Sequence, residues 1–467
     1  MLSSVNLQRF IFVVLFLLLG IGQTFGQDVR GPVIRGPQQV SGAARISSGQ
    51  PAALSFEQAI QIALKNNLST LLSHERRREA HGLKQQALAP LLPNISAAAY
   101  QASLTENLVA IGFEPGTIPG FNSPFIGPFR NFDARVLLAQ TVFDLSAIRG
   151  YQAAQAGVRI AEFQEALARE QVANGVGLFY LEAVRSERAV AAAEANVELA
   201  QALLQLAKDQ RNAGVATGVD VIRAQTRLAQ QQVDLAQAQT DSEQARLNLQ
   251  RVVGLPLGGP LTLTDQLRFN DENPPALEMA IDQAARDRRE VQVAEAQLNL
   301  SKRESQAARA EHLPSVDFLT DYGSSGVTPN RSNLPTRRVA VQVNVPIFNG
   351  GLTRGRVTAA ESRQKQDELQ LSNVRGQVEE DVRLALVTLR TAAVQVQAAN
   401  ETVTLAQREL EMSRDRFKSG VADNLEVVTA QTTLADARLV QVTALAQHNA
   451  ARLNLAAAMG RAEVFRW

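Results

Sequence analysis

The stretch that reads QRNAGVATGVDVIRAQTRLAQ over residues 210–230 recurs as RFKSGVADNLEVVTAQTTLAD over residues 416–436. An offset of 206 residues aligns Gly214 with Gly420 and superposes the two Ala-Gln-Thr triplets. A glycine between helix-forming segments supplies the positive-φ conformation of a tight helix end, so each copy predicts a helical hairpin that turns at its glycine. We therefore expect the chain to consist of two tandem repeats of one unit.

The segments that lead into these turns are long and suited to helices. Residues 145–213 contain no proline and are rich in Ala, Gln, Glu and Leu, which predicts one helix about 100 Å long. Residues 351–419 repeat this length. After Asn424 small and apolar residues recur every seven positions, which is typical of a coiled-coil seam. This seam comprises Leu425, Thr432, Leu439, Ala446 and Leu453, and a second flank comprises Ala430, Ala437, Ala444 and Ala451.

Helices with two such flanks can each take two neighbours and form a cylinder. An elongated soluble coiled coil, or a bundle filled with side chains, is the alternative on the helices alone. Shorter helices are expected over about 56–89 and 219–253. Their summed length matches that of the long helix between them, so both could lie along it, end to end.

Four stretches alternate between apolar and polar residues, which predicts strands over 95–104, 132–138, 316–322 and 338–347. The runs predict strands of about 10 to 12 residues, the length of a tilted strand that crosses an outer membrane. Four strands cannot close a membrane barrel, because the smallest use about eight and open edges are not tolerated in hydrocarbon. We therefore expect several copies to share one barrel, with three copies supplying 12 strands.

The connections over 105–130 and 323–335 are expected to be outward-facing loops. The phenylalanines of the first are expected to pack within the loop; the alternatives are that they anchor it at the membrane interface or narrow the mouth of the barrel. A soluble sheet is the alternative, but its apolar face would need a cover that only the already paired helices could supply.

Composition and the first residues narrow the function. The 467 residues carry 47 Lys and Arg against 46 Asp and Glu, so no strong field is available to bind nucleic acid. The absence of cysteine and the presence of only four histidines argue against an enzyme, a metal site or a cofactor. The apolar run from Phe10 to Leu19, followed by small residues up to Gly26, predicts a cleaved signal peptide. The chain is thus expected in the envelope of a Gram-negative bacterium.

These patterns divide the chain into six segments. The order expected within each repeat is one helix, two strands, a long helix and a shorter helix. The segments are a signal peptide over 1–26, an N-terminal arm over 27–53, a first repeat over 54–255, a linker over 256–275, a second repeat over 276–460 and a tail over 461–467.

The signal peptide, the two repeats and the pattern G-V-x(4)-[DE]-V-[IV]-x-A-Q at both turns resemble the TolC family of outer-membrane efflux proteins. The resemblance covers essentially the whole chain after the signal peptide. It implies a mainly helical fold in a homotrimer, with a 12-stranded outer-membrane β-barrel continuous with a periplasmic α-barrel of coiled-coil helices. It also implies a passive exit duct of a tripartite efflux or type I secretion system, opened by a periplasmic adaptor protein and an inner-membrane pump.

Many relatives carry an acylated N-terminal cysteine, which this chain lacks. We therefore expect it to be held in the lipid of the outer membrane by its barrel alone, with most of the chain in the periplasm. A non-channel envelope scaffold built of coiled coils is the alternative function.

The same resemblance assigns candidate site residues. Gly214 and Val215 in the first turn, with Gly420 and Val421 in the second, match the tips where adaptor hairpins dock in the family. The constriction of the family, often two acidic rings one helical turn apart, matches Glu426 and Thr429, so one acidic ring remains and predicts a cation-selective throat. A solvated helix charge is the alternative for Glu426. Three further residues are expected to hold the tip shut: Phe417, Asp220 and Arg223.

Overall fold

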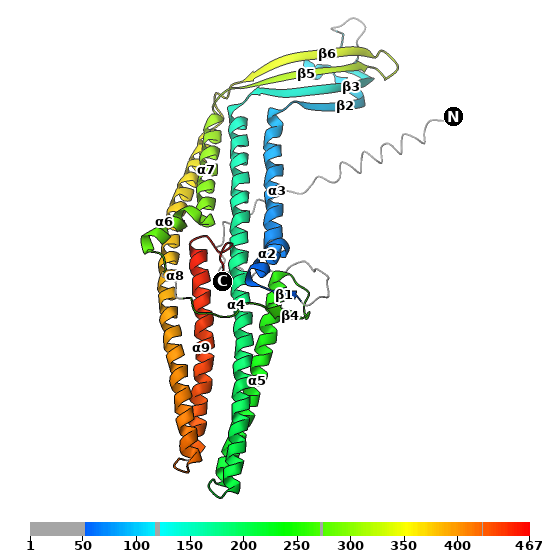
Figure 1. Cartoon of the computed structure of the whole chain (residues 1–467). Coiled ribbons are helices and arrows are strands. Elements are labelled where there is room, and N and C mark those ends of the chain that lie inside the picture. Colours follow the sequence, from blue (N-terminus) through cyan, green and yellow to red (C-terminus); the bar gives the residue numbers. More distant parts are fainter. Residues whose placement is uncertain (1–51, 117–121, 271–273, 423) are drawn as a thin grey trace, which may run out of the picture. The chain divides into compact units, whose positions relative to one another are not determined.

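The computed structural model describes residues 52–116, 122–270, 274–422 and 424–467. The predicted signal peptide, and the N-terminal arm as far as residue 51, lie outside the described residues. Figure 1 shows long helices that run from a sheet to two hairpin turns. The helices are α2 (Phe56–Asn66), α3 (Leu68–Leu88), α4 (Leu145–Asn212), α5 (Gly218–Val253), α6 (Leu277–Asp287), α7 (Arg289–Ala310), α8 (Leu352–Lys418) and α9 (Asn424–Ala458), with short 3₁₀ turns at Ala89–Leu91 and Val109–Ile111.

The two long helices have the predicted extent, with 68 residues in α4 and 67 in α8. Helix α4 begins where Asp144 accepts a hydrogen bond from the Ala147 backbone N–H at 3.1 Å, which caps its first turn. Helices α2, α3 and α5 all pack along α4, and α9 packs against both α8 and α4. The predicted arrangement of shorter helices along a long one is therefore confirmed in the first repeat.

The single helix expected over 56–89 is wrong, because the chain breaks at Asn67 between α2 and α3. Asn67 has an extended backbone, and its side-chain oxygen accepts a hydrogen bond from the Ser69 N–H at 2.9 Å. Its side-chain nitrogen donates to the Val252 carbonyl at 3.2 Å, so the break is tied to α5. Asparagine competes with the helical backbone for hydrogen bonds in this way. The second repeat breaks similarly at Arg288, whose guanidinium donates to the Ala458 carbonyl of α9.

The small flank of α9 is the one that the chain itself buries. All four alanines of that flank are buried, together with Val427 and Leu434. The seam that the heptad pattern predicted is only partly covered, since Leu425 and Leu439 remain about half exposed. Small side chains let helix axes approach closely, which suits the alanine flank to its contacts with α8 and α4; of the seam leucines, Leu453 is also buried against α4.

Four antiparallel strands form one sheet in the order β2-β3-β5-β6. Within the described residues the outer strands β2 and β6 each pair on one side only. The first two strands are longer than predicted, since cross-strand pairing continues as far as Asn107 and Phe125 and so replaces part of the loop expected over 105–130. The prediction that Ile347 lies in a strand is wrong; it is 94% exposed beyond the end of the sheet. The strands are β2 (Asn94–Asn107), β3 (Phe125–Phe143), β5 (Ser315–Gly326) and β6 (Leu334–Asn344).

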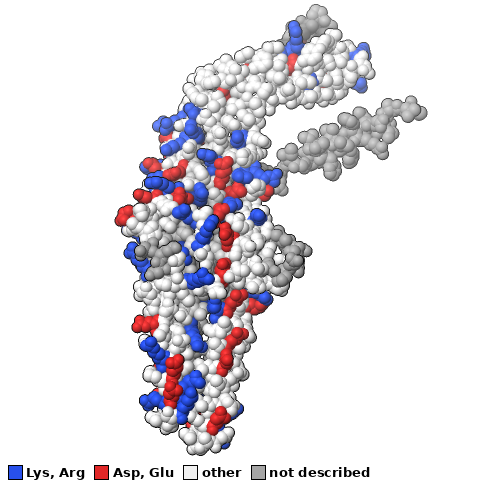
Figure 2. All heavy atoms as spheres, viewed as in Figure 1, with Lys and Arg blue, Asp and Glu red and all other residues white. Residues whose placement is uncertain are grey.

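The register of the sheet separates an apolar face from a polar one. Val341 pairs with Phe318, and Val343 with Val316, so apolar side chains of neighbouring strands share one face. Figure 2 agrees, because charged side chains gather over the helices and are sparse over the sheet in that view. None of the described helices carries an apolar stretch long enough to span a bilayer.

Four aromatic side chains, here called the equatorial cluster, join segments that are distant in sequence: Phe56, Tyr180, Phe465 and Trp467. The ring centroids of Phe56 and Tyr180 lie 5.7 Å apart, and those of Tyr180 and Trp467 lie 5.8 Å apart. Nearby, β1 (Ala52–Leu54) and β4 (Leu261–Leu263) pair in parallel. The Tyr180 hydroxyl donates to the Leu54 carbonyl at 2.9 Å, and burial raises the pKa of this phenol. The cluster thereby fastens the linker and the tail to the middle of α4.

Candidate functional site at the two hairpin tips

Both hairpins turn at the predicted glycine with the same backbone geometry. Gly214 has φ 78° and Gly420 has φ 72°, a conformation in which a side chain is strained. The next residue closes each turn, because the Val215 N–H donates to the Gln210 carbonyl at 2.9 Å and the Val421 N–H donates to the Arg416 carbonyl at 3.0 Å. These two valines are 61% and 71% exposed, so each tip presents an apolar side chain directly after its turning glycine.

In the first tip, Asp220 acts as a cap for its own helix. Its carboxylate accepts hydrogen bonds from the Thr217 backbone N–H at 2.8 Å and from the Thr217 hydroxyl at 2.6 Å. Arg223 lies one turn further along, with Nη1 3.7 Å from Asp220 Oδ1. Burial raises the pKa of Asp220, but the hydrogen bonds from Thr217 and the charge of Arg223 outweigh it and hold the pKa below its ordinary value. Asp220 and Arg223 are thus brought together within one hairpin.

In the second tip, the aligned acid Glu426 is engaged differently. Its Oε1 atom lies 3.2 Å from Arg416 Nε on α8 and accepts a long hydrogen bond of 3.4 Å from the Ser413 hydroxyl. The side chain is 40% exposed. Thr429 is exposed on the next turn, where its hydroxyl donates to the Leu425 carbonyl at 2.8 Å.

Phe417 lies inside the tip. It is 4% exposed and packs in a cluster that includes Leu203 from α4 with Val427 and Leu434 from α9. This residue therefore fills the core between the hairpins, and its backbone carbonyl is the part that accepts a bond from the neighbouring hairpin.

Two amide side chains that the sequence analysis did not single out tie the hairpins to each other. Gln210 Nε2 donates to the Phe417 carbonyl at 3.1 Å, and Asn424 Nδ2 donates to the Asp220 carbonyl at 2.9 Å. Asn424 is 1% exposed, so its amide is a buried link. The two repeats differ at both positions, since Arg416 aligns with Gln210 and Gly218 aligns with Asn424. This difference between the copies is the signal in the sequence that points to the two amides.

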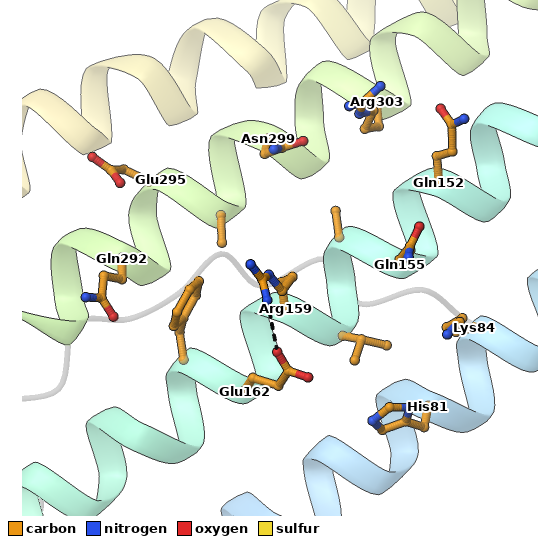
Figure 3. A pocket seen from close by; sticks show the side chains of 14 residues that line it. His81, Lys84, Gln152, Gln155, Arg159, Glu162, Gln292, Glu295, Asn299 and Arg303 are labelled. Carbon is orange, nitrogen blue, oxygen red and sulfur yellow. Dashed lines mark ion pairs between the residues drawn. The ribbon is translucent and has the colours of Figure 1, made fainter.

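A separate cavity of about 760 Å³ lies among α3, α4 and α7. Figure 3 shows charged and amide side chains from all three helices around it, including His81, Lys84 and Arg303. Arg159 and Glu162 form an ion pair of 3.9 Å along its wall. Nowhere in the described ranges do three acidic or histidine side chains form a group that could hold a metal.

Comparison with known proteins accounts for both repeats. The family described as "Outer membrane efflux protein" matches residues 59–255 and 280–461. Protein CyaE of Bordetella pertussis is 29% identical over 344 residues, which are 71% of each chain. Outer membrane protein TolC of Salmonella enteritidis is 21% identical over 415 residues, 86% of this chain and 81% of that protein.

Solved structures share the fold. The CmeC outer membrane channel of Campylobacter jejuni superposes with a TM-score of 0.75 at 15% identity, covering 92% of this chain and 94% of that one. The outer membrane protein VceC of Vibrio cholerae gives a TM-score of 0.72 at 16% identity, covering 87% and 96%.

Proposed function

Because the chain belongs to the outer membrane efflux protein family, whose TolC-like channels form trimers, we propose that three copies of it assemble into one exit duct. The protein is an outer-membrane efflux or secretion channel of a Gram-negative bacterium and not an enzyme. The family assignment thereby decides against the scaffold alternative. The observation that carries the trimer is the four-stranded sheet, whose outer edges at β2 and β6 have no strand partner among the described residues. Unpaired edges are not tolerated in hydrocarbon, so β6 of one copy pairs with β2 of the next.

The helices support the same assembly. An exposed apolar stripe runs along α8 at spacings of three, seven and eleven residues, which keep its members on one face, as in a helix that packs against another helix. Each of its members is more than half exposed in the single chain, and the neighbouring copy covers the stripe. The stripe comprises Leu384, Val387, Val394, Leu405 and Met412.

The tips form the periplasmic gate of this duct. Three copies of Glu426 place one acidic ring at the throat, which favours cations. The pair with Arg416 holds each carboxylate against its own hairpin. The links made by Gln210 and Asn424 keep the second hairpin against the first, and the closed throat depends on them.

The exposed valines at the tips are the docking points for a periplasmic adaptor. Val215 and Val421 stand beside positive-φ glycines, which keep the turns tight and the valines forward. An adaptor that inserts between the hairpins would separate the bonded amides and open the throat. The energy comes from an inner-membrane pump, as in efflux and type I secretion systems. Strands β2, β3, β5 and β6 hold the protein in the outer membrane, with most of the chain in the periplasm.

Covalent linking of neighbouring copies tests the assembly. The chain has no cysteine, so Ser96→Cys in β2 combined with Ala340→Cys in β6 gives one reactive group at each sheet edge. A bifunctional maleimide applied to outer membranes is expected to yield linked dimers and trimers. Either single variant serves as the matched control and is expected to yield no linked species larger than a dimer. A double variant that stays monomeric, together with purified protein that passes no current in planar bilayers, would overturn the proposal.

A further inference from the structure

The polar face of the sheet carries a chain of four charged side chains, here called the strand cluster: Asp133, Arg135, Asp321 and Arg338. Arg135 binds Asp133 through its guanidinium, with Nε 2.6 Å from Oδ1. The same guanidinium donates through Nη1 to Asp321 Oδ1 at 3.0 Å. Arg338 Nε donates to the second oxygen of Asp321 at 2.9 Å. The cluster thus links β3, β5 and β6 across the sheet.

The two ends of the cluster differ in exposure. Asp133 and Asp321 are 6% and 4% exposed because the arginines cover them. The Arg338 side chain is 63% exposed and is the part that faces open space. Gly323 stands directly opposite Arg135, and a Cβ there would lie 2.5 Å from the Arg135 Cβ. The glycine therefore makes room for the arginine that joins the two aspartates.

The strand cluster lies on the face that water must occupy. Side chains alternate along a strand, so Arg338 and Asp321 point away from the face that carries Val339, Val341 and Phe318. In an outer-membrane barrel the apolar face meets lipid and the polar face lines the interior. Arg337, next to Arg338, points to the opposite face and provides an internal reference.

We propose that the strand cluster sets the charge of the channel wall at the level of the outer membrane, and that Asp321 determines selectivity there by neutralising Arg135 and Arg338. Two carboxylates and two guanidiniums balance within each chain, so this level admits cargo of either charge. Removing Asp321 leaves one excess positive charge per chain on the wall, and removing the Arg338 charge leaves one excess negative charge. This inference rests on the proposed trimeric duct.

Reversal potentials measured across planar bilayers under a potassium chloride gradient test the proposal. Asp321→Asn is expected to change the permeability ratio of potassium to chloride about twofold to fivefold toward chloride, and Arg338→Gln by a similar factor toward potassium. The double variant is expected to return to the wild-type ratio, because the charges balance again. Arg337→Gln, which removes the same charge from the other face, is expected to leave the ratio unchanged. Raising the salt concentration should shrink each shift, since ions screen charges on the wall.

The outcomes separate this inference from the proposed function. Open channels whose ratio is the same in wild type, Arg338→Gln and Asp321→Asn would overturn the role of the cluster while leaving the duct intact. Equal shifts for Arg337→Gln and Arg338→Gln would overturn the assignment of the faces. A protein without any current would instead contradict the duct. Should Asp321→Asn fail to assemble, the two arginine variants decide alone, since both arginine side chains are exposed and the buried Asp321 keeps its bond to Arg135 when Arg338 is replaced.

Discussion

The two hairpin tips descend from one repeated pattern, yet the acid that they share has a different task in each. Asp220 is 8% exposed and serves as the cap of α5 through Thr217. Glu426 is aligned with it, but pairs with Arg416 across its own hairpin and remains partly exposed. The first copy uses the carboxylate for stability, whereas the second leaves it partly exposed, and we propose that it lines the channel throat. Alignment identifies equivalent positions, and only the local partners identify the role.

The tips also differ in what they contribute to the contact between them. The first hairpin donates through Gln210, and the second donates through Asn424 in return. The aromatic residue Phe417 of the second tip has Arg211, an exposed residue, as its counterpart in the first. The second tip is therefore packed into the first at positions where the copies have diverged.

The largest expected difference between the tips concerns the buried ring. Phe417→Ala is expected to lower the local free energy of unfolding of the second hairpin by about 3–5 kcal/mol, because it leaves a cavity between α4, α8 and α9. The counterpart Arg211→Ala is expected to change it by less than about 0.5 kcal/mol. Native-state hydrogen exchange at the last turns of α8 and α4 measures both. Equal protection in the two variants would mean that the ring does not hold the tip.

The second-largest effect is expected from removing the hydrogen bonds between the hairpins. Gln210→Ala with Asn424→Ala removes two bonds, each contributing about 1 kcal/mol, and is expected to raise channel conductance in planar bilayers. Gln441→Ala is the matched control, because it removes a 2.8 Å amide bond to Asn400 inside the second hairpin only. If the control opened the channel as much as the double variant, the bonds between hairpins would not be the closing element.

The aligned acids can then be exchanged for amides. Asp220→Asn is expected to cost about 1 kcal/mol of local stability through the weakened cap and to leave ion selectivity unchanged. Glu426→Gln is expected to change stability by less than about 1 kcal/mol, since its pair is exposed, while reducing preference for cations. Thermal unfolding and reversal potentials, measured on both variants, give the contrast. Loss of selectivity in Asp220→Asn would reverse the two roles.

The smallest effect is a dependence on acidity confined to the first tip. The pKa of Asp220 is lowered in the folded protein, so its contribution to stability is complete above its unfolded pKa of about 3.9 and disappears as the pH falls through the folded value. Amide exchange in the first turn of α5 is expected to accelerate, beyond its intrinsic pH dependence, below about pH 4. Thr217→Val, which removes the hydroxyl partner, should reduce this additional acceleration. An unchanged response in that variant would contradict the capping role.

Local features of the sequence predicted most of the fold. The uninterrupted helix over 145–213 and the turns at Gly214 and Gly420 depend on propensity and on backbone conformation, both of which are readable along the chain. The break at Asn67 was missed because it depends on a bond to the Val252 carbonyl, 185 residues away. The long pairing of β2 with β3 was missed for a different reason: the alternating pattern is weak at its outer end.

The positions of the two turns were predicted from the sequence, whereas the hydrogen bonds that join the hairpins were not. Duplication and family resemblance pointed to both tips, including Glu426 and Val421. The links through Gln210 and Asn424 join residues more than 200 positions apart, so no local pattern reveals them. The roles of the tip residues in gating and docking stay predictions.

The equatorial cluster gives the long helix α4 a pivot near its middle. Tyr180 fastens α4 near its middle, and about 48 Å of helix extends from there to Asn212 at 1.5 Å per residue. A tilt of about 5° at this pivot would move the tip by about 4 Å, which exceeds the distance between the donor and acceptor atoms of a hydrogen bond. A small rearrangement at the cluster is thereby amplified at the tips, so substitutions around Trp467 are expected to weaken the amide bonds that join the two hairpins.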